Sequence, residues 1–139
     1  MAIIRVGSTR IYRTIADAYY RAQPGDIILI DEGIYREQIS MNYTKHVHLI
    51  GNTRTPGLGK VVIVPPNEAT SRCLTFNNFL AEVTVYIEGI NFKFPLLGTL
   101  EPIAAWNCYF TNLVFNRCII NATLSHEYVF DFDVDQINS

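Results

Sequence analysis

The chain has 139 residues, of which 49% are hydrophobic and 17% charged, and its formal net charge is −2. This composition favours a single domain, residues 1–139, with a buried core. Scattered lysines and arginines form no basic stripe for nucleic acid, and no apolar run approaches the roughly 20 residues that cross a bilayer. Residues 1–6 lack the apolar core and cleavage site of a secretory signal. We therefore expect no nucleic-acid partner, no membrane partner and no secretion by a signal peptide.

The first predicted element is a helix over residues 14–22. Thr14 can act as the N-cap, Asp17 lies in the first turn, and Pro24 with Gly25 ends the segment. The apolar residues that recur at helical spacing are Ile15, Ala18, Tyr19 and Ala22. A helix this short is not stable alone, so we expect it to pack against an apolar surface.

After Gly25 the pattern changes to short strands separated by turns that contain glycine and asparagine. The predicted strands are Asp26–Asp31, Glu37–Asn42, Lys45–Ile50, Val61–Val64, Cys73–Phe76, Val83–Phe94, Trp106–Ile120 and Tyr128–Val134. This pattern is typical of an all-β body that follows one N-terminal helix.

An internal repeat suggests how the strands are arranged. Aligning residues 83–94 on residues 106–117 places Tyr86 on Tyr109, Ile90 on Leu113 and Phe92 on Phe115. A looser third copy, residues 128–132, follows Trp106 at a similar interval. A repeat of about 23 residues fits one coil of a β-solenoid, whereas a propeller blade needs about 40 residues.

The repeat predicts a short, right-handed, single-stranded parallel β-helix over residues 26–134, with the helix at 14–22 capping one end. We expect four or five coils, because the region before Val83 is long enough for two or three less regular ones. Tyr86 should then lie above Tyr109, and Phe92 above Phe115, in side-chain columns.

Four segments carry a resemblance to a known family, and they occur in the order Tyr12–Ala18, Gln23–Ile30, Gly33–Glu37 and His48–Gly51. This succession resembles the start of pectin-lyase-like proteins, most closely of pectinesterases, over roughly residues 12–66. The resemblance implies a capping helix, a Pro-Gly-Asp turn before the first strand, and a turn shaped by Gly33, Tyr35 and Glu37. In that turn Glu37 would accept hydrogen bonds from backbone amides.

The catalytic motifs of pectinesterases have no counterpart in the chain. That family uses two aspartates, a glutamine and an arginine in motifs resembling Gln-Asp-Thr-Leu and Asp-Phe-Ile-Phe-Gly. The segment Asp131–Asp135 is superficially similar to the second motif, but no glycine follows it and no Gln-Asp pair precedes it. The chain is also about half as long as those enzymes, so we expect no catalytic residues and no enzymatic activity.

Other candidate sites have structural interpretations. Asp131, Asp133 and Asp135 would share one face of a strand, but the outer two would lie about 13 Å apart, too far to bind one calcium ion. His46 and His48 would form only half of a zinc site, and His126 stands apart from them. The three cysteines, which we interpret as buried thiols, are Cys73, Cys108 and Cys118. We therefore predict no metal and no cofactor.

Two classes of function remain open. Small, non-catalytic β-helices with such a start look like components of virus particles, so the first hypothesis is a structural module of a virion, such as a phage capsid decoration or tail protein. It would assemble in the host cytoplasm, self-associate as a homotrimer and bind capsid or tail proteins. The alternative is a carbohydrate-binding or polysaccharide-active module, because exposed aromatic side chains could stack on sugar rings.

Overall fold

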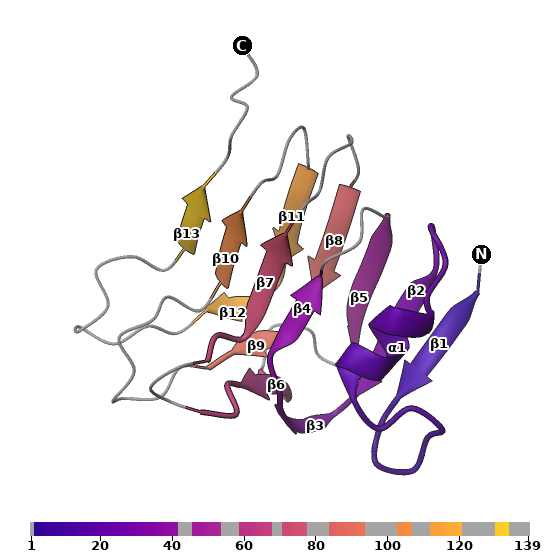
Figure 1. The fold of residues 1–139 in the computed structure, drawn as a ribbon. Coiled ribbons are helices and arrows are strands. Elements are labelled where there is room, and N and C mark those ends of the chain that lie inside the picture. The colour runs from indigo at the N-terminus through magenta and orange to yellow at the C-terminus, as the bar shows by residue number, and fades with distance from the viewer. Residues whose placement is uncertain are drawn as a thin grey trace.

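The computed structural model describes residues 2–41, 46–53, 59–67, 71–77, 84–93, 103–106, 112–120 and 130–133, and these form three parallel sheets and one helix (Figure 1). Sheet A contains β1 (Ile3–Val6), β2 (Ile27–Asp31), β5 (Val47–Asn52), β8 (Thr84–Glu88) and β11 (Asn112–Asn116). Sheet B contains β3 (Gly33–Arg36), β6 (Val61–Val64), β9 (Asn91–Phe92) and β12 (Ile119–Ile120). Sheet C contains β4 (Ile39–Met41), β7 (Leu74–Asn77), β10 (Ile103–Trp106) and β13 (Phe130–Asp133).

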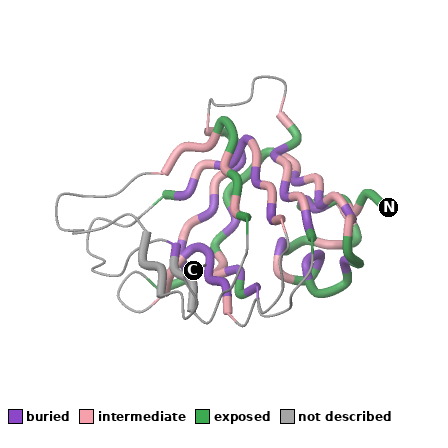
Figure 2. Tube along the Cα trace, turned by 90° about the horizontal axis from the view of Figure 1, so that it is seen from above, coloured by how far each residue is buried: buried purple, intermediate pink, exposed green. Residues whose placement is uncertain are grey.

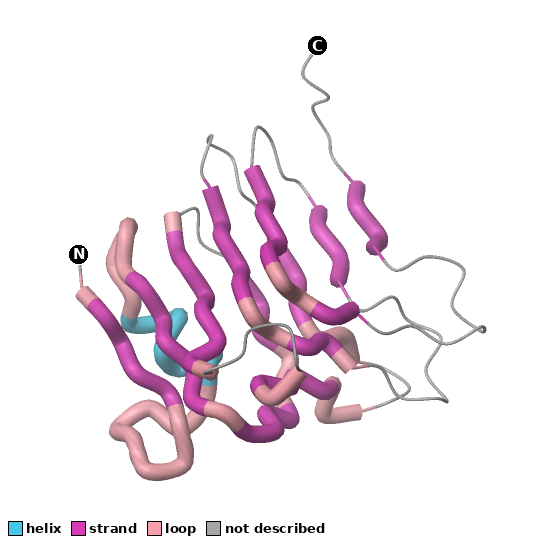
Figure 3. The backbone as a smooth tube through the Cα atoms, turned by 180° about the vertical axis from the view of Figure 1, so that it is seen from behind, coloured by secondary structure: helices cyan, strands magenta, loops and turns pink. Residues whose placement is uncertain are grey.

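The order of the strands defines the fold. From β2 onward, successive strands belong to sheets A, B and C in turn, so every third strand returns to the same sheet and pairs with the one before it in parallel. The described strands thus form four coils of a parallel β-helix, preceded by β1 (Figures 1 and 3). The predicted fold class and number of coils are confirmed.

The interior of the coils is filled with aliphatic side chains at alternate strand positions. In sheet A, Ile28, Leu49 and Ile87 are in register on neighbouring strands, and all three are fully buried. On each strand, the residues directly before and after these three are only partly buried, and Figure 2 shows this alternation. This period of two leaves an outer face on each sheet that can carry polar groups.

The helix α1 (Ile15–Arg21) covers the N-terminal end of the coils, close to the predicted range of 14–22 (Figure 1). Thr14 is the N-cap, and its hydroxyl oxygen accepts a hydrogen bond from the Asp17 amide at 3.2 Å. The buried residues of α1 are Ile15, Ala18 and Tyr19. Packing against β1, β2 and β4 stabilises a helix that is too short to fold alone.

Glu37 ties this helix to the first coil. Its carboxylate accepts hydrogen bonds from the amides of Ile15 at 2.9 Å and Ala16 at 2.8 Å, at the helix N-terminus. Burial raises the pKa of the Glu37 carboxyl, while the two amide bonds oppose that rise. The predicted amide-binding role of Glu37 is correct, but its partners belong to α1 rather than to a turn.

The Pro-Gly-Asp turn before β2 is present. Gly25 has φ of +89°, a conformation that residues with a Cβ rarely adopt. The buried carboxylate of Asp26 accepts hydrogen bonds from the amides of Ala2 and Gln23, both at 2.8 Å. Asp26 therefore joins the turn to the segment before β1.

Two predictions about the strands are wrong. Residues 33–36, predicted as a turn, form β3, because Ile34 and Tyr35 pair with Val62 and Ile63 of β6. The predicted strands 83–94 and 106–120 each contain breaks, at Gly89–Ile90 in the first case. The apolar pattern is continuous in the sequence, but the chain passes from one sheet to the next at each corner of the coil, and the strand ends there.

The predicted register of the repeat is also wrong. Tyr86 pairs with Val114, and Phe92 pairs with Ile120, so successive coils are offset by more than the alignment of Tyr86 on Tyr109 implies. Tyr109 lies outside the described residues. The rings of Phe92 and Phe115 do meet edge to face, with centroids 6.0 Å apart, but they extend from β9 and β11 in different sheets.

The third copy of the repeat is placed differently as well. Trp106 pairs with Asp133 rather than with Tyr128, which lies outside the described residues. The coils have unequal lengths, because the chain returns from Ile27 to its partner His48 over a much shorter segment than from Val47 to its partner Val85. The chain therefore has no fixed period.

Candidate functional site

The outer face of sheet A carries the polar side chains that form the candidate site. Two rows cross its strands, one through His48, Tyr86 and Val114, and the next through Ile50, Glu88 and Asn116. All of these positions alternate with residues that are more deeply buried, so their side chains extend away from the core.

Tyr86, Glu88 and Asn116 form a hydrogen-bonded group. These three residues and the neighbouring His48 are here called the Tyr86 cluster. The Tyr86 hydroxyl donates to Glu88 Oε1 at 2.7 Å. The Asn116 side-chain amide donates to the Tyr86 hydroxyl oxygen at 2.8 Å and to Glu88 Oε1 at 3.0 Å. The His48 ring lies beside the Tyr86 ring, with centroids 5.5 Å apart and an interplanar angle of 40°. The cluster thus joins β5, β8 and β11.

The chemistry of the cluster suits a ligand that is both polar and ring-shaped. Glu88 retains Oε2 as an acceptor, because the hydrogen bonds that the described residues donate to its carboxylate fall on Oε1. Tyrosine and histidine rings offer apolar faces with a polar edge, which suits stacking on a sugar ring. Histidine, tyrosine and glutamate are also side chains that transfer protons in enzymes.

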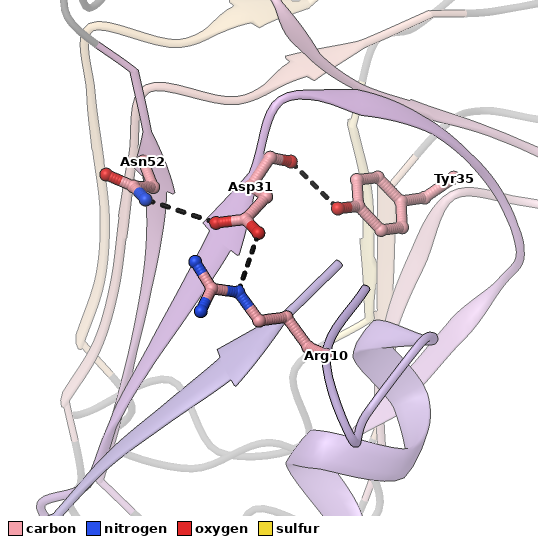
Figure 4. A network of polar contacts seen from close by, with 4 residues as sticks. All are labelled: Arg10, Asp31, Tyr35 and Asn52. Carbon is pink, nitrogen blue, oxygen red and sulfur yellow. Dashed lines mark hydrogen bonds and ion pairs between the residues drawn. The ribbon is translucent and has the colours of Figure 1, made fainter. Parts of the chain in front are cut away.

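A second polar group, the Asp31 network, is centred on β2 of the same sheet. Figure 4 shows its four residues, Arg10, Asp31, Tyr35 and Asn52. Asp31 Oδ2 accepts from Arg10 Nε at 2.9 Å, and Oδ1 accepts from the Asn52 side-chain amide at 3.1 Å. The Tyr35 hydroxyl donates to the Asp31 backbone carbonyl at 2.8 Å. The hydrogen bond from Arg10 is the main cause that lowers the pKa of the Asp31 carboxyl, Asn52 adds to it, and burial opposes it.

The close approach of Asp31 to the loop before α1 depends on Gly7. A Cβ at Gly7 would overlap the carboxylate of Asp31, so no larger residue fits without displacing that side chain. The loop is closed by the Gly7 amide, which donates to the Tyr12 carbonyl at 3.0 Å, and this arrangement presents Arg10 to Asp31.

The two polar groups are neighbours on one surface. Asn52 lies two residues beyond Ile50 on β5, and Ile50 pairs with Glu88. With neighbouring strands about 4.8 Å apart and a two-residue step of about 6.7 Å, the Cα atoms of Asn52 and Glu88 are about 8 Å apart. That separation is comparable to the dimensions of one or two sugar units.

The histidines of the sequence analysis serve different roles. His46 Nδ1 accepts a hydrogen bond from the Thr84 amide at 3.0 Å, while His48 belongs to the Tyr86 cluster. Within the described ranges, no group of three or more His, Cys, Asp or Glu side chains comes together as a metal site would require. His126 lies outside them.

The aspartates and cysteines add no second site to the described structure. Asp131 pairs in register with Ala104, and Asp133 with Trp106, while Asp135 lies outside the described residues. Cys73 is buried, which raises the pKa of its thiol to about 12 and makes it unreactive at neutral pH. Cys118 is partly buried, its thiol pKa is also raised by burial, and Cys108 is outside the described residues.

Sequence reasoning missed the Tyr86 cluster. Its signal was the alternation of Tyr86, Ile87 and Glu88, which puts the two polar side chains on one face of a strand. Asn116 could be placed beside them only with the correct register between β8 and β11.

The sequence matches no protein-family model and no curated protein. Two solved structures match the fold. One is the PL6 family alginate lyase AlyGC, with a TM-score of 0.66 and 17% identity over 96% of this chain and 18% of that one. The other is a pectin methylesterase from Aspergillus niger, with a TM-score of 0.57 and 17% identity over 84% of this chain and 48% of that one. The chain thus has a parallel β-helix fold like theirs, and it spans less than half the length of either neighbour.

These matches correct the expectation that the chain is not an enzyme. That expectation rested on the missing pectinesterase motifs, but both structural neighbours are carbohydrate-active enzymes, and one of them is a lyase rather than an esterase. Motifs of one reaction were too narrow a test, because one fold supports several reactions. Neither neighbour is a virion protein, so the prediction of a virion component gains no support from them.

Among the described residues, the structure contains no helix long and apolar enough to cross a membrane.

Proposed function

We propose that this chain is a β-helical module of a polysaccharide-active protein, and that the outer face of sheet A around the Tyr86 cluster is its sugar-binding surface. The observation that carries the proposal is the hydrogen-bonded group of Tyr86, Glu88 and Asn116, which lies next to the His48 ring on adjacent coils. The shared fold with an alginate lyase and a pectin methylesterase supports it.

The surface offers the two kinds of contact that sugars require. Sugar hydroxyl groups donate hydrogen bonds to directional acceptors, which Glu88 Oε2 and the side-chain carbonyl oxygen of Asn116 supply. The carbon faces of the sugar rings need an apolar surface, which the rings of His48 and Tyr86 and the neighbouring Val114 side chain supply. Val114 is 40% exposed, and a bound sugar would cover it.

The cluster also contains the groups for proton transfer. In ester hydrolysis or β-elimination, one group must take a proton and another must give one. His48, Tyr86 and Glu88 could divide these roles at one sugar unit, because they occupy neighbouring positions on β5 and β8. We therefore extend the proposal from binding to chemistry on the polysaccharide.

The test compares two tyrosine variants. Tyr86→Ala removes the centre of the cluster, whereas Tyr20→Ala removes an exposed tyrosine, 68% accessible, from α1. Calorimetric titration of the wild type with alginate, polygalacturonate and methyl-esterified pectin should show binding of at least one of them. We expect Tyr86→Ala to weaken that binding about tenfold and Tyr20→Ala to leave it unchanged.

Catalysis is tested on the same polymers, by release of methanol and by formation of unsaturated uronate products. Turnover in the wild type that is lost in Glu88→Gln and Tyr86→Phe would support the chemical part of the proposal. Failure of the wild type to bind any of the three polymers would contradict the whole proposal.

Self-association as a homotrimer and binding to capsid or tail proteins of a virus particle remain separate proposals. A light-scattering measurement of mass in solution tests the first, since a 15.8 kDa monomer and its trimer are readily distinguished. Co-sedimentation with a candidate virus particle tests the second.

A further inference from the structure

The corners between sheets A and B contain an unusual arginine. β8 ends at Glu88 and β9 begins at Asn91, while β11 ends at Asn116 and β12 begins at Ile119. Because Glu88 pairs with Asn116, and Asn91 with Ile119, the first corner residues, Gly89 and Arg117, are equivalent in successive coils. The Gly89 amide also donates to the Asn116 carbonyl at 3.0 Å.

Both corner residues have a left-handed backbone. Gly89 has φ of +70° and Arg117 has φ of +54°. Glycine takes this conformation freely, whereas the Cβ of any other L-residue crowds the backbone there. Arg117 is the single non-glycine residue with positive φ in the part of the chain that the structure describes. At a position where the preceding coil uses glycine, this coil uses a long cationic side chain.

No contact within the described part of the fold explains the arginine. Arg117 is exposed, and the ion pair found among the described residues is that of Arg10 with Asp31. The nearest carboxylate by register is that of Glu88, and no ion pair between it and Arg117 is found among the described residues. Residues held in such strained backbone conformations cluster at active sites and ligand-binding sites.

We infer that Arg117 is a specificity-determining residue that binds a carboxylate of an acidic sugar seated on the Tyr86 cluster. This inference rests on the proposed function. Arg117 directly follows Asn116, a member of the cluster, so this exposed residue lies at the edge of the same surface. A guanidinium binds a planar carboxylate with two parallel hydrogen bonds, which an uncharged methyl ester cannot match.

The experiment uses a variant that should raise the thermal stability of the protein and lower its affinity for the acidic polymer. Arg117→Gly supplies the residue that this backbone conformation favours, so we expect a Tm higher by about 2 °C. The same change removes the guanidinium, so we expect affinity for polygalacturonate to fall about tenfold. Affinity for fully methyl-esterified pectin, which has the same sugar backbone without the charge, should stay within about twofold.

Arg36→Gln is the matched control, because Arg36 is an exposed arginine on β3 at the opposite end of the coils, and its loss changes the net charge equally. It should leave the affinity for polygalacturonate nearly unchanged. Equal losses in Arg36→Gln and Arg117→Gly would overturn the inference, since the effect would then reflect overall charge alone.

Two further results would overturn it. One is a Tm lower in Arg117→Gly than in the wild type, because the arginine would then serve the fold. The other is binding of polygalacturonate by Arg117→Gly with wild-type affinity. If the wild type binds none of the polymers, the proposed function fails first, and that outcome is distinct from a variant that binds as well as the wild type.

Discussion

The N-terminal end of the coils and the later coils use polar side chains in opposite ways. At the N-terminal end, the carboxylates of Asp26 and Glu37 each accept two backbone amides, and the Tyr35 hydroxyl donates to a backbone carbonyl. In the later coils, Tyr86, Glu88 and Asn116 bond to one another on an outer face. The first pattern stabilises the fold through backbone hydrogen bonds, whereas the second leaves hydrogen-bond acceptors for a ligand.

This difference separates structural from functional carboxylates. A buried carboxylate must have its acceptors filled by the protein, because an unpaired charge in the interior is strongly destabilising. A carboxylate on an outer face faces no such demand, since water satisfies it until a ligand arrives. The burial and partners of each acidic residue therefore indicate its role better than its place in a sequence motif.

The largest effect is expected from the core of the later coils. Phe92 is fully buried and packs edge to face against Phe115, so Phe92→Ala should reduce the free energy of unfolding by about 3–5 kcal/mol. Urea denaturation followed by circular dichroism measures the change. Phe115→Ala is the control: its side chain is only partly buried, so its loss should be smaller, and an equal or larger loss would mean that the two rings are wrongly placed.

A smaller loss is expected where two coils come closest together. A Cβ at Gly51 would overlap the carbonyl oxygen of Gly89, a backbone atom that cannot move cheaply, so Gly51→Ala should cost about 2–3 kcal/mol. Gly89→Ala is the comparison: its Cβ would meet Gly51 O at an ordinary 3.6 Å, and its cost of about 1–2 kcal/mol would come from φ of +70°. The reverse order in urea denaturation would contradict the placement of these corners.

The next prediction concerns the N-terminal end. Glu37→Ala removes the acceptors of the Ile15 and Ala16 amides at the start of α1, and should destabilise the fold by about 2 kcal/mol. Glu37→Gln keeps one acceptor oxygen and should lose about half as much. Polymer binding at the Tyr86 cluster should be unchanged in the folded fraction of both variants, and a loss of binding there would contradict the separation of the two regions.

Local features of the chain could be predicted from the sequence, but contacts between coils could not. The helix at 14–22 and the Pro24–Gly25 turn follow from capping, spacing and glycine chemistry, all of which act between near neighbours. The segment 33–36 is misjudged from sequence because Gly33 suggests a turn, whereas pairing with β6 makes it a strand. Pairing is a property of the neighbouring coil, and propensity does not include it.

The candidate site depended on the register, which the sequence did not reveal. Inward positions on successive coils hold interchangeable aliphatic residues, such as Ile28, Leu49 and Ile87, so many alignments pack equally well. Matching aromatic residues instead aligned Tyr86 with Tyr109, although the sheet pairs Tyr86 with Val114. Loops of unequal length between coils remove the fixed period on which such an alignment relies.

The smallest effect on stability is expected at Asp31. This residue belongs to the first coil, but its carboxylate accepts hydrogen bonds from side chains on the outer face, as Glu88 does in the later coils. Because the pKa of Asp31 is lowered in the folded state, chiefly by the hydrogen bond from Arg10, its ionised form stabilises the fold above the unfolded pKa of about 4. That stabilisation is lost as pH falls through the lower, folded pKa. Asp31→Asn removes it, so the difference in Tm between wild type and variant should be small but present at pH near 7 and should vanish in acid.

Thermal melts from about pH 7 to about pH 3 measure this difference, and the wild type alone would not suffice. Glu37 titrates with the opposite sign, because burial raises its pKa and its contribution declines as pH rises through that raised value. Subtracting the Asp31→Asn curve cancels the Glu37 contribution, which both proteins share. The difference should also shrink in high salt, since the Arg10–Asp31 pair lies near the surface. A difference that stays constant with pH and salt would show that Asp31 acts by packing rather than by charge, and would place it with Asp26 and Glu37 as a residue of the fold.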